Sequence, residues 1–266
     1  MPEASVNEKP AGAAFPAMVG PLVEPSPRWI RVKAGPVLVA DSSRALLLRE
    51  YGPGRLPTYY FPQQDVRMDL LHRTPDDSSA DGQTRWTVNA GEMLVENGAW
   101  GYEDPPPDRE GLRGHVTFAW DKGLAWFEEE EKVFVHARDP YKRVDVLRSS
   151  RAVKVVIGGE TVAETSRPTL LFETSLPTRY YIPIEDVRMQ FVEPSATTTH
   201  CPYKGVASYW SVRVGETFKR DVAWTYREPI RENPKIKDLV CFFNERVDLY
   251  VGGALQVRPR TPWTRE

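Results

Sequence analysis

The stretches YYFPQQDVRM (59–68) and YYIPIEDVRM (180–189) are near-copies of each other within one chain of 266 residues. Two further echoes keep the same order: VADSSRALLLRE (39–50) returns as VAETSRPTLLFE (162–173), and GEMLVENGAWGY (91–102) returns as GETFKRDVAWTY (215–226). The copies lie roughly 120 residues apart, which is too long for a solenoid repeat and long enough for a domain with its own core. The sequence therefore predicts a tandem duplication.

The apolar pattern within each copy mostly has the period of two that is typical of strands. Alternate residues of VDLYV (247–251) and of SVRV (211–214) fall on one face, and Gly158-Gly159 predicts a hairpin turn between two short strands. One segment departs from this pattern: IPIEDVRM (182–189), with Pro183 at its start, predicts a single helical turn. We therefore expect a mostly β protein with very little helix.

These patterns divide the chain into a Pro/Ala-rich tail (1–27), a first domain (28–138) and a second domain (139–266). The connecting stretch DPYKRVDVLRSS (139–150) is too apolar for a free linker, so we expect the two domains to pack on each other. The charge run Glu128–Glu131 is interpreted as a solvated loop that precedes a strand over KVFVHA (132–137).

Composition limits the classes of partner. The formal net charge is −2, so nothing pulls the whole chain toward nucleic acid or an anionic membrane. We find no run of about 18 apolar residues and no secretory signal at the N-terminus. With two cysteines the chain fits a reducing compartment, and we expect a cytoplasmic protein without nucleic-acid or membrane partners.

The heptapeptide THCPYKG (199–205) occurs once, although the blocks around it occur twice. In its place the first copy has a polar loop rich in Asp and Ser, without Cys, Tyr or Lys. Loss of a site is tolerated more easily than loss of a core, so this difference predicts a functional site in the second domain. The alternative is a structural turn.

Local geometry constrains this candidate site. Pro202 favours an extended Cys201, which puts His200 and Cys201 on opposite faces of a strand and Thr199 on the face of Cys201. Tyr203 joins that face if the extension continues past the proline, and Gly205 lets Lys204 turn inward.

Three roles are open for Cys201: a catalytic thiolate beside a cation, a zinc ligand, or a small residue beside a pocket. The cation would be Lys204, Arg188 or Arg179. Because the chain has no Cys-x-x-Cys pair, and Cys241 in VCFFN is expected in the core, we predict neither metal nor cofactor.

The other candidates also have structural alternatives. Arg179 and Arg188 suit a carboxylate or phosphate, but Arg188 also suits an ion pair with Asp186 or Glu173. One tyrosine of Tyr180-Tyr181 should lie in the core and the other should line a pocket. The tryptophans Trp210 and Trp224, which recur as Trp86 and Trp100, are expected in the core, with Trp224 near the ligand.

The second copy carries a recognisable pattern in LLFETSLPTRYYIPIEDVRM (170–189), TTTHCPYKGVASYWSV (197–212) and VAWTY (222–226). It resembles the bacterial and fungal domain-of-unknown-function family four-two-seven, in which a tandem arrangement is familiar. The resemblance implies two β-tent-like domains, each of two small antiparallel sheets pinned at one edge, related in fold to methionine-R-sulfoxide reductases and to the ligand-binding domain of cereblon. It implies no activity, and no residues here support the nucleotidyltransferase label attached to the family.

Three functions are compatible with these residues. The first is a small-molecule pocket between the sheets of the second domain, with aromatic walls and Lys204, His200 and an arginine as polar anchors. The second is an enzyme that uses Cys201 as nucleophile or redox thiol, or Lys204 and His200 in acid–base chemistry. The third is a protein-interaction module. Under the first, replacing Lys204 or His200 with Ala should abolish binding at little cost in stability.

Overall fold

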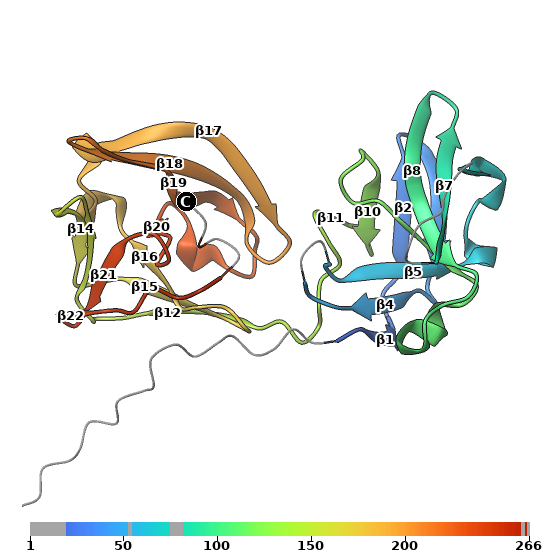
Figure 1. Ribbon diagram of the computed structural model, residues 1–266, viewed down its shortest axis with the longest axis horizontal. Helices are drawn as coiled ribbons and strands as arrows, with labels where there is room; N and C mark the ends of the chain where they lie inside the picture. The colour runs from blue at the N-terminus through green and yellow to red at the C-terminus, as the bar shows by residue number, and fades with distance from the viewer. Residues whose placement is uncertain (1–19, 53–54, 75–81, 262–263, 265–266) are drawn as a thin grey trace, which may run out of the picture. The chain divides into compact units, whose positions relative to one another are not determined.

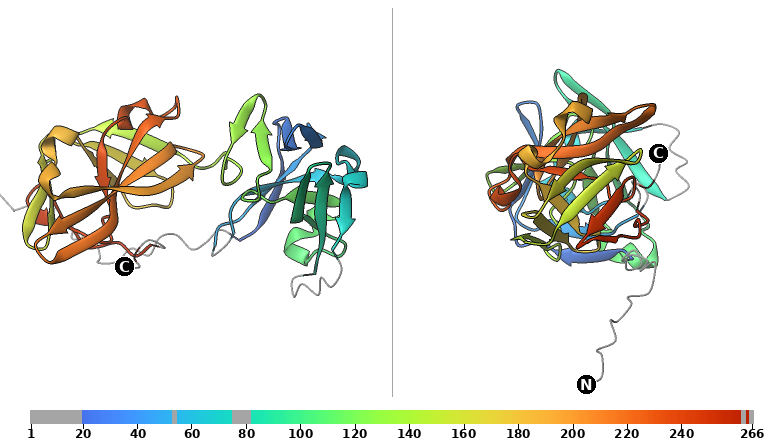
Figure 2. Two further views of the ribbon diagram at one scale, coloured as in Figure 1. Left: turned by 90° about the horizontal axis from the view of Figure 1, so that it is seen from above. Right: turned by 90° about the vertical axis from the view of Figure 1, so that its left-hand side faces the viewer.

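The computed structural model describes residues 20–52, 55–74, 82–261 and 264. The chain divides into two compact units, with the boundary between Tyr141 and Lys142. Within the described ranges all regular structure is strand or short 3₁₀ turn, so the predicted mostly β fold is confirmed (Figures 1 and 2).

In its described residues the first half has eleven strands in two antiparallel sheets. The larger sheet has the order β1-β4-β5-β9-β8-β7-β6 and the smaller one β11-β10-β2-β3. Their bounds are β1 Leu22–Pro25, β2 Ile30–Ala34, β3 Val37–Ser42, β4 Leu46–Arg49, β5 Thr58–Pro62, β6 Leu71–Arg73, β7 Gln83–Ala90, β8 Met93–Tyr102, β9 His115–Phe118, β10 Ala125–Glu128 and β11 Glu131–Val133. The 3₁₀ turns are η1 Gln63–Asp65, η2 Met68–Leu70 and η3 Pro107–Leu112.

The second half repeats this topology strand for strand. Its larger sheet has the order β12-β15-β16-β20-β19-β18-β17 and its smaller sheet the order β14-β13-β21-β22. Their bounds are β12 Val144–Arg148, β13 Val153–Ile157, β14 Glu160–Thr165, β15 Thr169–Glu173, β16 Arg179–Ile182, β17 Val192–Cys201, β18 Gly205–Val214, β19 Thr217–Pro229, β20 Val240–Phe242, β21 Asp248–Val251 and β22 Ala254–Leu255. The 3₁₀ turns are η4 Ile184–Asp186, η5 Met189–Phe191 and η6 Pro234–Ile236. The predicted duplication is thus present in the architecture.

Two local predictions are confirmed: the hairpin turn at Gly158-Gly159 and the helical turn after Pro183. Ile157 pairs with Glu160 across Gly158 and Gly159, whose φ values of 59° and 82° suit a two-residue hairpin turn. The predicted helical turn is η4, a 3₁₀ turn that follows Pro183. In both halves the Asp of the Asp-Val-Arg turn accepts a hydrogen bond from a hydroxyl of the smaller sheet: Ser42 donates to Asp65 at 2.6 Å and Thr165 donates to Asp186 at 2.6 Å.

Each half has its own core between its two sheets. In the first half Trp126 is the largest fully buried side chain, and it contacts Tyr59, Phe61 and Phe118. In the second half the cluster joins β13, β14 and β21 of the smaller sheet to the larger sheet through residues such as Ile182 and Val212. Separate cores explain why each copy reads as a domain.

The structure differs from the sequence-based boundaries at three places. β1 extends the first sheet to Leu22, inside the stretch assigned to the tail. The apolar part of the connecting stretch forms β12, an edge strand of the larger sheet of the second half. Glu128 is buried at the end of β10, so the charge run begins inside a strand, and the following strand ends at Val133 instead of Ala137.

No helix within the described ranges has the length and apolar character needed to cross a membrane.

The separate cores lead to a first prediction. Trp126→Ala should lower the free energy of unfolding of the first half by about 3–5 kcal/mol, because it removes a buried indole from the centre of one core. Hydrogen exchange should then show lost protection in β2 and β10 and unchanged protection in β13 and β21. Equal loss of protection in both halves would show that the cores do not unfold independently.

Candidate functional site

The larger sheet of the second half curls around a hydrophobic cluster. This cluster contains Val146, Leu171, Tyr181, Ala207, Trp224, Tyr226, Ile236, Cys241 and Phe243. It runs from β12 at one edge to β18 near the other, which requires strong curvature because neighbouring strands lie about 4.8 Å apart. We call this side the concave face. In Figure 1 the long strands β17, β18 and β19 arch above β15 and β12.

A buried ion pair closes one side of the concave face. Lys204 Nζ lies 2.5 Å from Glu173 Oε2, and Lys142 Nζ lies 3.4 Å from Glu173 Oε1. The Lys204 and Glu173 side chains are only 12% and 6% exposed. The contact therefore ties the tip of the β17–β18 hairpin to the end of β15.

Burial and charge compete at this pair. Burial acts to raise the pKa of the Glu173 carboxyl, but the charges of Lys204 and Lys142 outweigh it and hold that pKa below its ordinary value. Burial alone would lower the pKa of the Lys204 ammonium. The negative charge of Glu173 is the largest of the effects that oppose burial, and together they raise the pKa of Lys204 above its ordinary value. Both groups are therefore ionised at neutral pH.

The heptapeptide forms the turn that delivers Lys204. Its first residues lie in β17, and the Lys204 N–H donates to the Cys201 carbonyl oxygen at 3.3 Å. Gly205 has a φ of 106°, and a Cβ at this position would lie 3.0 Å from the Glu228 carbonyl oxygen. Glycine is thus required here, and Lys204 turns inward as the sequence predicted.

Strand register separates the heptapeptide side chains. Thr199 pairs with Ala207, which is buried on the concave face, and the Thr199 hydroxyl lies 3.0 Å from the Tyr209 hydroxyl. His200 pairs with Val206, and both are exposed on the opposite face. Thr199 and Cys201 therefore share the concave face, whereas His200 is directed away from Lys204 and cannot act beside it.

Cys201 lies between the ion pair and an aromatic group. Cys201 and Lys204 belong to one turn, because the Lys204 N–H donates to the Cys201 carbonyl oxygen, and Cys201 is among the causes of the raised pKa of Lys204, after burial and Glu173. Tyr209 stacks on Phe243 with ring centroids 6.4 Å apart, and Phe243 lies 4.5 Å from Trp224. Cys201 is partly exposed.

The second thiol has a different environment. Cys241 is fully buried, and burial raises its pKa to about 12. It is a core residue, as the sequence indicated.

Arg179 forms the other buried ion pair of the concave face. Two of its nitrogens donate to Glu245 at 2.7 and 2.8 Å, and its guanidinium lies 5.6 Å from the Trp224 ring. The Thr261 hydroxyl also donates to Glu245 at 2.7 Å. Arg179 is therefore bound to a carboxylate of its own chain and is no open anchor for a ligand carboxylate.

The remaining candidates lie away from the concave face. Tyr180 packs against the core between the sheets and lines a small cavity there, whereas Tyr181 is buried on the concave side. Tyr203 contributes its carbonyl oxygen, which accepts from Asn233 Nδ2 at 2.7 Å. The predicted pocket between the sheets thus does not gather all its residues: Tyr180 lies there, but Lys204 and Cys201 do not.

Among the described residues Arg188 forms neither of the predicted ion pairs with Asp186 and Glu173, and its role as an anchor for a carboxylate or phosphate stays a prediction. Its side chain is exposed, while Asp186 bonds Thr165 and Glu173 bonds Lys204 instead. Its N–H donates to the Val162 carbonyl oxygen at 2.9 Å, so what the structure shows of Arg188 is a backbone contact between the sheets.

In the first half a different cation binds the carboxylate that corresponds to Glu173. Glu50, which matches Glu173 at the end of the echoed block, accepts from Arg109 of η3 at 2.6 Å. The neighbouring Tyr60 and Tyr102 match Tyr181 and Tyr226. Both halves therefore keep the buried carboxylate but supply its cation from different segments.

Sequence reasoning missed Glu173, Tyr209 and Glu245. The signal for Glu173 was present, because a glutamate ends both copies of the VAxxSR block. Glu245 lies in the weakly matching tail of the copy, and its partner Arg179 is distant in the chain, so no local pattern marks it.

No group of His, Cys, Asp and Glu side chains suited to a metal ion occurs among the described residues.

The chain is a tandem, all-β protein, since each half has the same pair of antiparallel sheets. Its candidate site lies in the second half, because in the first half Arg109 takes the place of the heptapeptide lysine beside the carboxylate. A family model described as a domain of unknown function (DUF427) matches residues 22–129 and 145–253. The chain belongs to this family, with two such domains in tandem. No curated protein matches the chain significantly.

Burial of the ion pair corrects the expectation that Lys204 contributes little to stability. Lys204→Met should lower the free energy of unfolding by about 3 kcal/mol, because it leaves Glu173 buried with only Lys142 near. Arg213→Met, which removes an exposed partner of Glu193, should cost less than about 1 kcal/mol. Urea unfolding of both variants measures the difference.

The sign of the pH dependence follows from the two pKa shifts. The lowered pKa of Glu173 contributes stability above its unfolded value of about 4.3 that is lost as pH falls further. The raised pKa of Lys204 contributes stability below about 10.4 that is lost as pH rises further. The effect of Lys204→Met should therefore shrink below about pH 4, and a constant effect down to pH 2 would contradict the assignment.

Proposed function

We propose that the second half is a small-molecule-binding module whose ligand lies on the concave face beside Cys201, Thr199 and Tyr209. The observation that carries this proposal is the register of the β17–β18 hairpin. It puts a thiol and two hydroxyls next to the stacked rings of Tyr209 and Phe243, above a buried ion pair. A few polar groups beside aromatic side chains are the usual composition of a ligand site.

Contrast between the halves supports the same assignment. In the first half Arg85 and Trp86 stand where the second half has Tyr209 and Trp210, and no cysteine accompanies them. Arg109 takes over the contact with the buried carboxylate, so the fold there does not need a heptapeptide turn. The heptapeptide therefore adds the thiol and the hydroxyl of Thr199 in one half only.

A second candidate function, an enzyme with Cys201 as nucleophile, is favoured by one observation. Lys204 and Cys201 belong to the same turn, so a cation accompanies the candidate nucleophile. His200 is on the opposite face and takes no part in this candidate.

Alkylation by iodoacetamide tests the binding site. Cys201 should react in the folded protein and Cys241 should not, because Cys241 is fully buried with a pKa of about 12. Members of a small-fragment library that bind at the concave face should slow the alkylation of Cys201, read by intact-protein mass. Read by thermal shift, which needs no thiol, these hits should no longer bind Cys201→Trp and should still bind His200→Trp, on the other face of the same strand.

The outcomes separate the two candidates. Protection of Cys201 with an alkylation rate that Lys204→Met leaves unchanged supports a binding site with a passive thiol. A rate that falls several-fold in Lys204→Met supports the nucleophile. Hits that survive Cys201→Trp would place the ligand elsewhere and contradict the binding site beside Cys201, and an alkylation rate that Lys204→Met leaves unchanged contradicts the nucleophile.

A further inference from the structure

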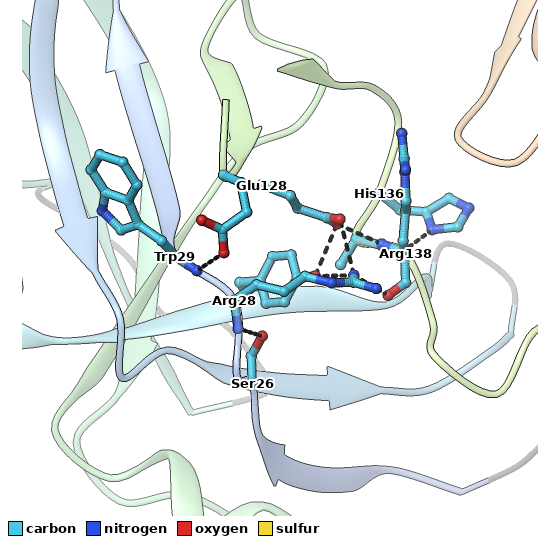
Figure 3. A network of polar contacts seen from close by, with 9 residues as sticks. Ser26, Arg28, Trp29, Glu128, His136 and Arg138 are labelled. Carbon is cyan, nitrogen blue, oxygen red and sulfur yellow. Dashed lines mark hydrogen bonds and ion pairs between the residues drawn. The ribbon is translucent and has the colours of Figure 1, made fainter. Parts of the chain in front are cut away.

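The first half contains a buried carboxylate that is held by an arginine and a tyrosine (Figure 3). Arg28 donates to Glu128 Oε2 at 2.9 Å, and the Tyr59 hydroxyl donates to Glu128 Oε1 at 2.9 Å. The Arg138 N–H donates to the same oxygen, Oε1, at 3.1 Å. This network shows how the fold binds a carboxylate at the edge of the core between its sheets.

The second half keeps the arginine and the tyrosine but lacks the carboxylate. Arg28 lies two residues before Ile30 of β2, and Arg151 lies two residues before Val153, the equivalent of Ile30 in β13. Tyr59 matches Tyr180 in the echoed block. Glu128 pairs with Ile30, and the residue that pairs with Val153 is Val251, so an isopropyl group stands where the first half has a carboxylate.

Tyr180 has no partner of the kind that Tyr59 has: among the described residues no side chain hydrogen-bonds the Tyr180 hydroxyl. Burial raises the pKa of this phenol, and the positive charge of Arg151 acts in the opposite direction. Arg151 itself is exposed.

Two tryptophans of the first half are also missing from the second. Trp120 and Trp126 stack with centroids 4.1 Å apart and rings inclined by 6°. Trp126 pairs with Val32 of β2, and the equivalent pair in the second half is Leu249 with Val155. Trp120 follows Ala119, whose N–H donates to Gly98, and Asn244 follows Phe243, whose N–H makes the equivalent bond to Val222.

A cavity lies where these rings are lost. It has a volume of about 160 Å³ and is lined by residues that include Tyr180, Leu249, Asn244, Thr178, Gln256 and Pro259. Asn244 Nδ2 donates to the Thr178 carbonyl oxygen at 2.9 Å, which fixes one wall. A cavity of roughly 150 Å³ admits a single aromatic ring, so the size of this cavity suits one planar ring.

We infer that this cavity binds a small aromatic carboxylate, whose ring replaces the missing indoles and whose carboxylate lies between Tyr180 and Arg151 as Glu128 does between Tyr59 and Arg28. The ligand thus supplies to the second half the two groups that the first half supplies from its own chain. This site lies on the opposite side of the larger sheet from Cys201 and does not depend on the concave-face proposal.

Benzoate is the test probe, with benzamide as the neutral isostere and acetate as the ringless control. Titrated into the full chain at millimolar concentration, benzoate should shift the amide NMR signals of Thr178, Asn244 and Leu249. Benzamide and acetate should bind at least about tenfold more weakly, the loss expected when one charged hydrogen bond or one buried ring is missing.

Three variants locate the site. Arg151→Gln should weaken benzoate binding about tenfold and leave benzamide unchanged. Lys154→Gln, which removes a charge from the other face of β13, should change neither. Leu249→Trp should abolish binding by restoring the first half's indole, and if that variant does not fold, Arg151→Gln against Lys154→Gln still decides.

The inference is overturned if benzoate leaves the signals of the cavity residues unshifted, or if Arg151→Gln binds it as tightly as the unaltered chain. Equal affinity for benzoate and benzamide would overturn the carboxylate assignment.

Discussion

The contact between Glu173 and Lys204 constrains the whole second half. In the order of the larger sheet, β15 and β18 are four strand spacings apart, which on a flat sheet is roughly 19 Å. The two side chains nevertheless lie 2.5 Å apart. Only a sheet that curls back on itself permits this, and the curl is what creates a concave face for Cys201 and Tyr209. The ion pair is costly to bury, and losing one partner costs more than never having had either.

The first half meets the same constraint with a different partner. Its Glu50 is buried at the same position, but Arg109 comes from the connection between β8 and β9 instead of from a hairpin tip. Comparing the two copies therefore distinguishes the residues that the fold requires from those that a binding site would require. The fold needs a cation on this carboxylate, whichever segment delivers it. A thiol and a hydroxyl at the hairpin tip are not needed for that purpose.

The sequence was informative where the physics is local. Period-two patterns predict strands such as β18, paired glycines predict the turn at Gly158 and Gly159, and alternation puts His200 and Cys201 on opposite faces. Contacts between distant segments were not predictable in this way. The pairing of Lys204 with Glu173, and of Arg179 with Glu245, depends on sheet order and curvature. No short window of sequence encodes these.

The same limit explains why the charge run at Glu128 was misinterpreted. Four consecutive glutamates suggest a solvated loop, yet the pleat of β10 turns Glu128 inward and its neighbour Phe127 outward. Inside, the carboxylate is tolerated only because Arg28, Tyr59 and the Arg138 N–H satisfy both its oxygens. In the second half the arginine and the tyrosine persist as Arg151 and Tyr180, while the carboxylate is gone. An arrangement built to satisfy a carboxylate, with an open cavity in place of two indoles, is the physical basis for expecting that its missing members come from a ligand.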